Sequence, residues 1–163
     1  VAKIMRIIER KVGSKNASFY ELKFMSKGMT VLIPTDNAAA IGIRPLSSCQ
    51  EVDGVIQALM LPGRRLKNEY GVASNWNRRY KEYQQRLRTG NLIEISEIYR
   101  ELKEIAQQKE LSFGEKSLLQ QTELLLAEEI SAVRKLEEDK AVEYLRTLCH
   151  LEYGKVSMHN SQP

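Results

Sequence analysis

The sequence has few of the residues and motifs that build catalytic or metal centres. It contains two cysteines, two histidines and one tryptophan, and it has no CxxC or HExxH pattern of the kind that predicts a zinc site. No glycine-rich loop has the Walker or Rossmann spacing that binds phosphate. His150 and His159 lie near the C-terminus without an acid, nucleophile or metal ligand to pair with. We therefore expect no enzyme, no metal, no cofactor and no small-molecule substrate.

Long apolar runs are also missing. No stretch approaches the roughly 20 apolar residues that span a bilayer, and charged residues interrupt the first apolar stretch, so we expect neither a membrane contact nor a signal peptide. Cys49 and Cys149 lie far apart, without the spacing of a disulfide framework. We expect both thiols to be reduced, in a cytoplasmic and nucleoid-associated protein.

Charge is present but unevenly distributed. Residues 60–90 contain eight Lys or Arg and two Glu, whereas residues 91–163 contain nine basic and fourteen acidic residues. The net charge of +4 conceals this asymmetry. A basic middle segment suits a phosphate backbone, which would repel the acidic rear of the chain.

The N-terminal part has strand composition with turn residues between the strands. The predicted strands are Ile4–Val12, Ser18–Met25, Met29–Ile33 and a short fourth strand, Ile41–Arg44. Gly13 begins the first turn, and Pro34 closes the third strand because proline cannot donate to a ladder. We expect a small curled antiparallel sheet over residues 1–46.

The remainder has helical periodicity and capping residues. Five helices are predicted, over 48–61, 74–88, 91–106, 112–130 and 138–151. The apolar face of the fourth is predicted to contain Phe113, Leu118, Leu119, Thr122, Leu125, Leu126 and Ile130. The predicted fold class is thus α+β, with a β domain at 1–46, a helical domain at 47–153 and a flexible tail at 154–163.

The segment Ser74–Arg88 surrounds the single tryptophan. On a helix, Trp76, Arg79, Tyr80, Tyr83 and Leu87 share one side. The other side is a basic stripe about three turns long, which can follow a phosphate backbone; it contains Arg78, Lys81, Gln85 and Arg88.

Periodicity leaves two interpretations of Trp76 open. It is either a core residue at the start of a helix or an exposed apolar wedge that enters a distorted base step or stacks on an unpaired base. Its place in the first turn after a loop favours the wedge, and the basic stripe is either a nucleic-acid contact or a solvated face.

Several motifs of this chain resemble the CarD/CdnL family of bacterial transcription regulators. In the helical part these are Asn75-Trp-Asn-Arg-Arg-Tyr-Lys81, Gly90 and Leu111-Ser-Phe-Gly-Glu-Lys116. In the β part they are Phe19-Tyr-Glu-Leu-Lys23, Met29-Thr-Val-Leu-Ile-Pro34 and Ile41-Gly-Ile-Arg44. The resemblance covers about residues 2–133.

The resemblance implies a Tudor-like β domain that docks on the RNA polymerase β subunit by adding a strand to a sheet edge. The positions implied for this contact are Lys11, Thr30, Val31, Leu32, Ile33 and Pro34. The family's usual first strand has no counterpart, because Val1 falls just after the place where that strand would end. Either the chain is a fragment or this member differs.

The resemblance also implies that the helical domain contacts promoter DNA at the upstream edge of the melted bubble. Trp76 would enter the minor groove, and Arg78, Arg79, Lys81 and Lys116 match basic positions of the family's DNA-facing patch; Arg86 of the same basic segment is added to them. The hypothesis is a regulator of low sequence specificity that stabilises open promoter complexes. The alternative is a helical protein-interaction adaptor with a basic surface and no direct DNA contact.

Overall fold

The computed structural model describes residues 1–25, 28–61 and 76–151 of the chain. The chain divides into two compact units, Val1–Leu46 and Ser47–Pro163, and each is considered by itself. The predicted basic loop of residues 63–73, the helix cap at Ser74 or Asn75 and the tail from Gly154 lie outside the described residues.

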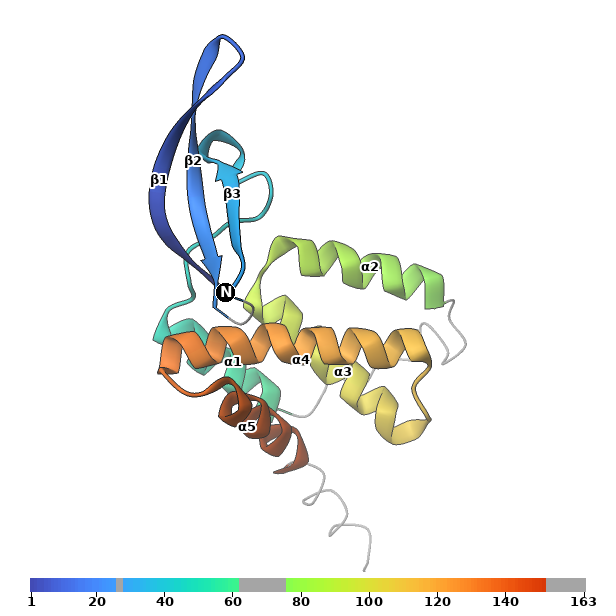
Figure 1. Ribbon diagram of the computed structural model, residues 1–163. Helices are drawn as coiled ribbons and strands as arrows, with labels where there is room; N and C mark the ends of the chain where they lie inside the picture. The colour runs from blue at the N-terminus through green and yellow to red at the C-terminus, as the bar shows by residue number, and fades with distance from the viewer. Residues whose placement is uncertain (26–27, 62–75, 152–163) are drawn as a thin grey trace, which may run out of the picture. The chain divides into compact units, whose positions relative to one another are not determined.

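The first unit contains an antiparallel sheet with the strand order β1-β2-β3 (Figure 1). Its strands are β1 (Ala2–Val12), β2 (Lys15–Phe24) and β3 (Thr30–Pro34). Gly13 begins the tight β1–β2 turn with a φ of +63°, a conformation that glycine adopts without strain. The three predicted strands are therefore confirmed, with a small extension of the first hairpin.

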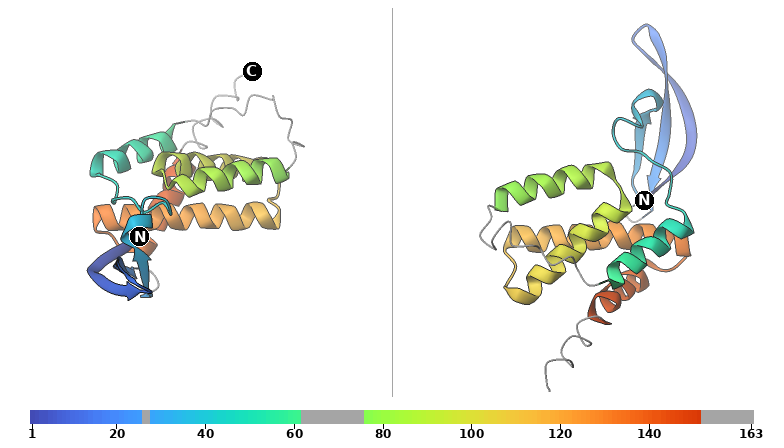
Figure 2. Two further views of the ribbon diagram at one scale, coloured as in Figure 1. Left: turned by 90° about the horizontal axis from the view of Figure 1, so that it is seen from above. Right: turned by 180° about the vertical axis from the view of Figure 1, so that it is seen from behind.

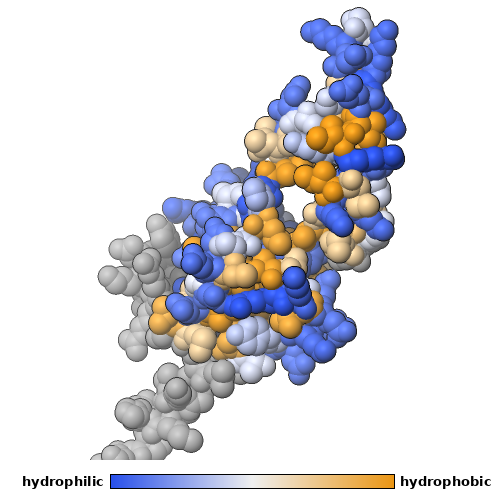
Figure 3. All heavy atoms as spheres, turned by 90° about the vertical axis from the view of Figure 1, so that its left-hand side faces the viewer, coloured by the Kyte–Doolittle hydropathy of each residue, from blue (hydrophilic) through white to orange (hydrophobic). Residues whose placement is uncertain are grey.

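One face of the sheet is apolar and largely open to solvent. Leu22 lies opposite Ile4 on β1 and Val31 on β3, so the three side chains share this face. Only Leu22 among them is fully buried, at 5% exposure, whereas Ile4 is 52% exposed. Apolar side chains on the surface of this unit are visible in Figure 3. The sheet buries little of its apolar surface within its own unit.

The predicted strand at Ile41–Arg44 is wrong. After Pro34 the chain forms a short 3-10 helix, η1 (Thr35–Asn37), and then a series of turns. Backbone hydrogen bonds run from Ile41 N to Asn37 O and from Ile43 N to Ala38 O. Gly42 has a φ of +83°, which breaks an extended conformation. Local turn bonds thus satisfy the backbone groups that a fourth strand would have used.

The second unit contains five helices among the described residues. They are α1 (Cys49–Met60), α2 (Trp76–Thr89), α3 (Leu92–Gln108), α4 (Phe113–Arg134) and α5 (Glu138–Leu151). Ser48 and Ser112 form the predicted capping boxes with the glutamates three residues later. Asn91 caps the N-terminus of α3. Gly90 directly follows the last residue of α2 and has a φ of +67°, the left-handed conformation with which helices often end. The α+β fold class is confirmed.

The helices pack around two adjoining apolar clusters. The larger cluster joins α1, α3, α4 and α5, and its fully buried members include Val52, Tyr99, Leu126 and Leu145. The smaller cluster lies between α2, α3 and α4 and contains Tyr83, Ile98, Leu102 and Leu118. The helix α2 lies on the side of α4 opposite α5 (Figures 1 and 2). One surface of α2 is therefore anchored while the other faces outward.

Phe113 and Leu125 correct the predicted apolar face of α4. Phe113 is 89% exposed and Leu125 is 36% exposed, whereas Leu118, Thr122, Leu126 and Ile130 are buried. These four residues follow one another at four-residue steps, and Phe113 lies five positions before Leu118, which turns it away from their stripe. Phe113 and Leu125 are apolar, but neither occupies a core position.

A buried carboxylate links three helices. Glu123 on α4 is 8% exposed, and its Oε1 accepts a hydrogen bond of 3.1 Å from the Tyr99 hydroxyl on α3. Arg146 on α5 donates to both of its oxygens, at 2.9 and 2.7 Å. Burial raises the pKa of Glu123, but the hydrogen bonds from Arg146 and Tyr99 outweigh it, so the pKa lies below its usual value.

Candidate nucleic-acid interface

The helix α2 presents an anchored side and an exposed side. Tyr83 is 4% exposed within the smaller cluster, and Leu87 packs against it. The predicted basic stripe is exposed along its length, at Arg78, Lys81, Gln85 and Arg88. A shallow, open hollow runs along this surface and is lined by Asn77, Arg78, Lys81, Glu82 and Gln85. The arrangement presents cations along about three turns of one helix.

Trp76 is neither fully buried nor fully exposed. It is the first residue of α2, and it is partly buried against the cluster that contains Tyr83 and Leu118. Its ring centroid lies 5.4 Å from that of Tyr80, whose side chain is 42% exposed. The two interpretations that the sequence left open are therefore partly combined, since part of the indole packs on the helices and part remains accessible.

The indole packs closely on the first turn of α4. A Cβ atom added to Gly114 would lie 2.8 Å from the Trp76 Cζ2 and 3.3 Å from its Cε2. Real Cβ atoms essentially never approach a heavy atom within 3.0 Å, so only glycine fits under the indole in this position. Gly114 thus forms the surface on which Trp76 rests.

Arg79 turns toward the protein instead of toward solvent. Its Nη2 lies 3.0 Å from Oε1 of Glu115, and its side chain is 23% exposed. Its Cζ also lies 5.9 Å from the centroid of the Trp76 ring, within the range of a cation–π contact. Among the described residues, its buried Nε finds no hydrogen-bond partner. Arg79 was predicted as a DNA contact, but in this structure its charge is engaged by a carboxylate of α4.

Glu115 collects several donors around one buried carboxylate. Besides Arg79, Lys109 Nζ donates to both oxygens at 3.1 Å, and the Ser112 backbone N–H donates to Oε2 at 2.9 Å. Burial raises the pKa of Glu115, but the hydrogen bonds from Ser112 and Lys109 prevail and hold the pKa below its usual value. A charged Glu115 therefore fixes the first turn of α4 to that of α2.

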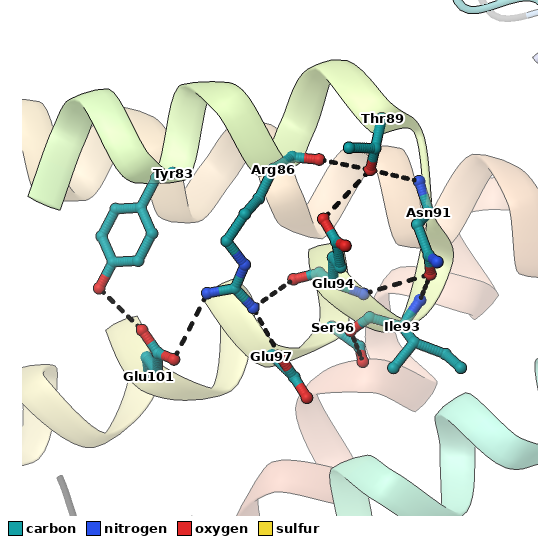
Figure 4. A network of polar contacts seen from close by, with 9 residues as sticks. All are labelled: Tyr83, Arg86, Thr89, Asn91, Ile93, Glu94, Ser96, Glu97 and Glu101. Carbon is teal, nitrogen blue, oxygen red and sulfur yellow. Dashed lines mark hydrogen bonds and ion pairs between the residues drawn. The ribbon is translucent and has the colours of Figure 1, made fainter.

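Arg86 is likewise engaged inside the helical unit (Figure 4). Its Nη2 lies 2.6 Å from Oε2 of Glu97, and its Nη1 lies 3.7 Å from Oε1 of Glu101. The Tyr83 hydroxyl donates to the other oxygen of Glu101 at 2.9 Å. Burial, followed by the charge of Glu101, raises the pKa of that hydroxyl. Arg86 was also predicted as a DNA contact, and its partners on α3 draw it away from the exposed stripe.

Lys116 remains available on the first turn of α4. Its side chain is 56% exposed, and its Nζ lies 2.8 Å from Oε1 of Glu110, which is 87% exposed. An exposed pair of this kind contributes little to stability, because water solvates both charges well. A phosphate could therefore compete with Glu110 for this lysine.

Phe113 is the exposed residue that the sequence interpretation missed. It directly precedes Gly114 in the chain, and it is 89% exposed. The available signal is the four-residue spacing from Leu118 to Ile130, which falls on Gly114 and not on residue 113 when it is continued toward the N-terminus. The first turn of α4, on which Trp76 rests, thus carries an exposed aromatic residue.

The residues predicted for the polymerase contact fall on two separate edges. Strand β3 pairs with β2 along one side, and within the described residues its other side carries no strand. Lys11 lies on β1, near the first hairpin, where it pairs with Asn16 beyond the reach of β3. Thr30–Pro34 forms one continuous edge, but Lys11 does not belong to it.

The pairing of β3 indicates which backbone groups point outward. Phe24 N donates to Met29 O at 2.8 Å, and bonded and non-bonded pairs alternate along an antiparallel ladder. Counted from this pair, Leu32 occupies a non-bonded position opposite Glu21, so its N–H and C=O point away from β2. Pro34, two residues later, also occupies a non-bonded position, so its missing N–H does not interrupt the pairing with β2. The outer edge of β3 can therefore accept another strand.

Comparison with known proteins identifies the helical unit. The family model described as "CarD, C-terminal domain" matches residues 64–146, which include α2, α3, α4 and most of α5. This chain belongs to the CarD family. The resemblance predicted from the sequence motifs is thereby confirmed, and CarD proteins are a family of transcription regulators, not enzymes.

A protein of known sequence is similar to a longer part of this chain than the family model covers. The Bacillus subtilis (strain 168) protein named "Putative transcription factor YdeB" is 24% identical over 135 residues, which cover 83% of this chain and 84% of that protein. A match of this length includes part of the β unit as well as the helices.

The described residues contain neither a membrane-spanning helix nor a metal-binding cluster. Within residues 1–25, 28–61 and 76–151, none of the helices is long and apolar enough to cross a membrane. In the same part of the chain, no three His, Cys, Asp or Glu residues come together in a way that could hold a metal ion.

Proposed function

We propose that this CarD-family protein regulates transcription initiation by binding both the RNA polymerase β subunit and promoter DNA at the upstream edge of the bubble. It stabilises the open complex and acts on DNA that is being melted, as a cytoplasmic, nucleoid-associated protein. Family membership supports the general role. The single observation that supports the DNA contact is the partly accessible Trp76 at the start of an exposed basic helix surface.

The aromatic surface suits a distorted duplex. An apolar side chain that enters the minor groove at a base step partly unstacks it, which costs a few kcal/mol per step. That cost is smallest where the duplex is already opening, so the contact favours the edge of a bubble over intact DNA. Phe113 offers further apolar surface beside Gly114, and Tyr80 supports the indole from α2.

The cations around Trp76 suit phosphates rather than base edges. Arg78 and Lys81 lie exposed on the outer side of α2, and Lys116 lies exposed on the first turn of α4. Phosphate contacts orient a protein on DNA without reading its sequence. The proposed contact therefore has low sequence specificity and an affinity that falls steeply with salt.

The polymerase contact is proposed for the outer edge of β3. Thr30–Pro34 would add to a sheet edge of the polymerase β subunit through main-chain hydrogen bonds, in which the outward groups of Leu32 take part. Lys11, on the other edge strand, would contact the partner only through a separate surface near the first hairpin.

The energetic role requires no chemistry on a substrate. A ligand shifts an equilibrium only by the difference between its affinities for the two states. Tighter binding to the open than to the closed complex lengthens the lifetime of the open complex, and a tenfold difference corresponds to about 1.4 kcal/mol.

The test compares Trp76→Ala with Tyr144→Ala in an assay of open-complex lifetime. Tyr144 is an exposed aromatic residue of α5, at 41% exposure, and it lies outside the proposed site. Trp76→Ala should shorten the lifetime while binding to a polymerase β fragment persists, and Tyr144→Ala should change neither. An unchanged lifetime with folded Trp76→Ala would contradict the proposal and would favour an adaptor that contacts only protein.

A further inference from the structure

We propose that Gly114 and Glu115 of α4 are positioning residues for Trp76. Gly114 sets how deeply the indole rests on the helical unit, and Glu115 fixes the first turn of α2 through Arg79. The inference rests on the proposed function, because the position of the indole matters only if Trp76 contacts DNA.

The glycine at position 114 is explained by a close approach rather than by backbone conformation. Among the described residues the glycines with positive φ are Gly13, Gly28, Gly42 and Gly90, and Gly114 is not one of them. Within a helix glycine is generally less favourable than alanine, since it leaves the backbone freer when unfolded. The Trp76 ring, however, leaves no room for a Cβ, with Cζ2 at 2.8 Å and Nε1 at 3.4 Å. The helix thus tolerates a poor helix former where the indole needs the space.

Gly54 shows that this constraint is local. It lies inside α1, and a Cβ added there would meet nothing within 4 Å. The two positions therefore form a matched pair of helical glycines, one beneath an aromatic ring and one beside open space. Only the first should resist an added methyl group.

The second positioning contact passes through a guanidinium. Glu115 is 1% exposed, and its Oε1 lies 3.0 Å from Arg79 Nη2. The same guanidinium has its Cζ 5.9 Å from the centroid of the Trp76 ring. Arg79 is thus held by the carboxylate on one side while it borders the indole on the other. Movement of Glu115 would be transmitted to the ring through one side chain.

Fixing the indole before binding has a physical advantage. A side chain that is already ordered loses less conformational freedom when it enters a base step, so more of its contact energy appears as affinity. A displacement of about 1 Å is enough to impair a site that depends on shape. Gly114 and Glu115 would therefore affect the open complex without touching DNA themselves.

The first experiment measures the position of the indole in the free protein. Trp76 is the only tryptophan, so fluorescence reports on it alone. Gly114→Ala should shift the emission to the red and increase quenching by acrylamide, because the added methyl group displaces the ring outward. Gly54→Ala should leave both unchanged. Unchanged fluorescence in folded Gly114→Ala overturns the positioning role, whatever Trp76→Ala does to transcription.

A second pair of variants tests the carboxylate. Glu115→Gln keeps the shape and the oxygen that accepts from Ser112 but removes the charge that holds Arg79. Glu123→Gln removes a buried charge from the same helix at a site formed by Tyr99 and Arg146. Acrylamide quenching should increase in Glu115→Gln and stay at the wild-type level in Glu123→Gln. An equal response in both variants would mean that general loosening, not positioning, is being measured.

The functional experiment is a double-mutant cycle on open-complex lifetime with the full chain. Gly114→Ala should shorten the lifetime several-fold, and Gly114→Ala combined with Trp76→Ala should match Trp76→Ala alone, since the glycine acts through the indole. A further loss in the double variant would assign Gly114 a role independent of Trp76 and overturn the inference. If Trp76→Ala itself has no effect, the proposed function fails, and the fluorescence result still decides the positioning role.

Discussion

Arg79 and Glu115 form an ion pair of 3.0 Å between the first turns of two helices, although 36 residues separate them in the sequence. The contact gives a basic residue of the Trp76 motif a partner inside the protein. It also divides the arginines of α2 into two groups, because Arg86 is bound to α3 in the same manner while Arg78 stays exposed. Composition alone does not distinguish these groups.

The two groups of arginines should respond differently to neutralisation. Arg78→Gln should reduce the slope of log affinity for fork-shaped DNA against log salt by about 1, because one phosphate contact contributes roughly 0.9 to that slope. Arg86→Gln should leave the slope unchanged and instead lower the free energy of unfolding, since Glu97 and Glu101 lose their partner. Titrations at several salt concentrations, with denaturant unfolding of both variants, provide the measurement. A slope change in Arg86→Gln alone would refute the assignment.

Phe113 should be unimportant for stability. Phe113→Ala should change the free energy of unfolding by less than about 0.5 kcal/mol, as surface substitutions usually do. Leu118→Ala, at 2% exposure on the same helix, should cost about 2–5 kcal/mol because it leaves a cavity. Urea unfolding of the two variants checks the contrast. A large loss of unfolding free energy in Phe113→Ala would show that Phe113 is a core residue.

The free energy of unfolding of the helical unit should fall in acid, in part because Glu123 becomes protonated. Its pKa lies below the ordinary value of 4.5, so the folded state favours the charged form, and this stabilisation is complete above pH 4.5. It is lost as the pH falls from about 4.5 through the lower folded pKa. Glu123→Gln should therefore lose less stability than the wild type between pH 7 and pH 3. Parallel acid dependence of the two proteins would show that Glu123 does not contribute.

The outer edge of β3 can be blocked without removing a side-chain charge. Leu32→Pro eliminates an N–H that points away from β2, so the pairing of β2 with β3 should persist while strand addition is impaired. Val31→Pro, one residue earlier, removes an N–H that faces β2 and should disrupt the sheet itself. Binding to a polymerase β fragment, with circular dichroism of both variants, gives the result. Full binding by folded Leu32→Pro would exclude this edge as the contact.

The helix boundaries were predictable because the signals that set them are local. Ser48, Asn91 and Ser112 cap helices through groups two or three residues away, and Gly90 ends α2 by its own backbone conformation. These contacts depend on neighbours in the sequence, which can be read directly. Helical periodicity indicated the helices between these boundaries, and strand composition with turn residues indicated the three strands.

The side-chain partners of the α2 arginines and the turns at Ile41–Arg44 depend on distant residues or on register. Arg79 was correctly placed on the side of Trp76 by the helical wheel, but its partner Glu115 lies on another helix. Nothing in the segment around Arg86 indicates Glu97 as its partner, and its contact with DNA stays a prediction. Ile41–Arg44 contains apolar residues but forms no strand. Turn hydrogen bonds around Gly42 satisfy its backbone groups instead. The sequence shows which residues are basic or apolar, but the contacts that these residues make depend on tertiary neighbours.

The engagement of Arg79 and Arg86 within the chain has a consequence for how the protein would be distributed on a chromosome. Each phosphate contact that is given up weakens attraction to ordinary duplex, so free copies would spend little time on the vast excess of non-promoter sites. Under the proposed function, a polymerase-bound copy holds its DNA-contacting surface at an effective concentration that can reach the millimolar range for a short linker. A surface too weak to search the genome alone would then act only where polymerase has already stopped.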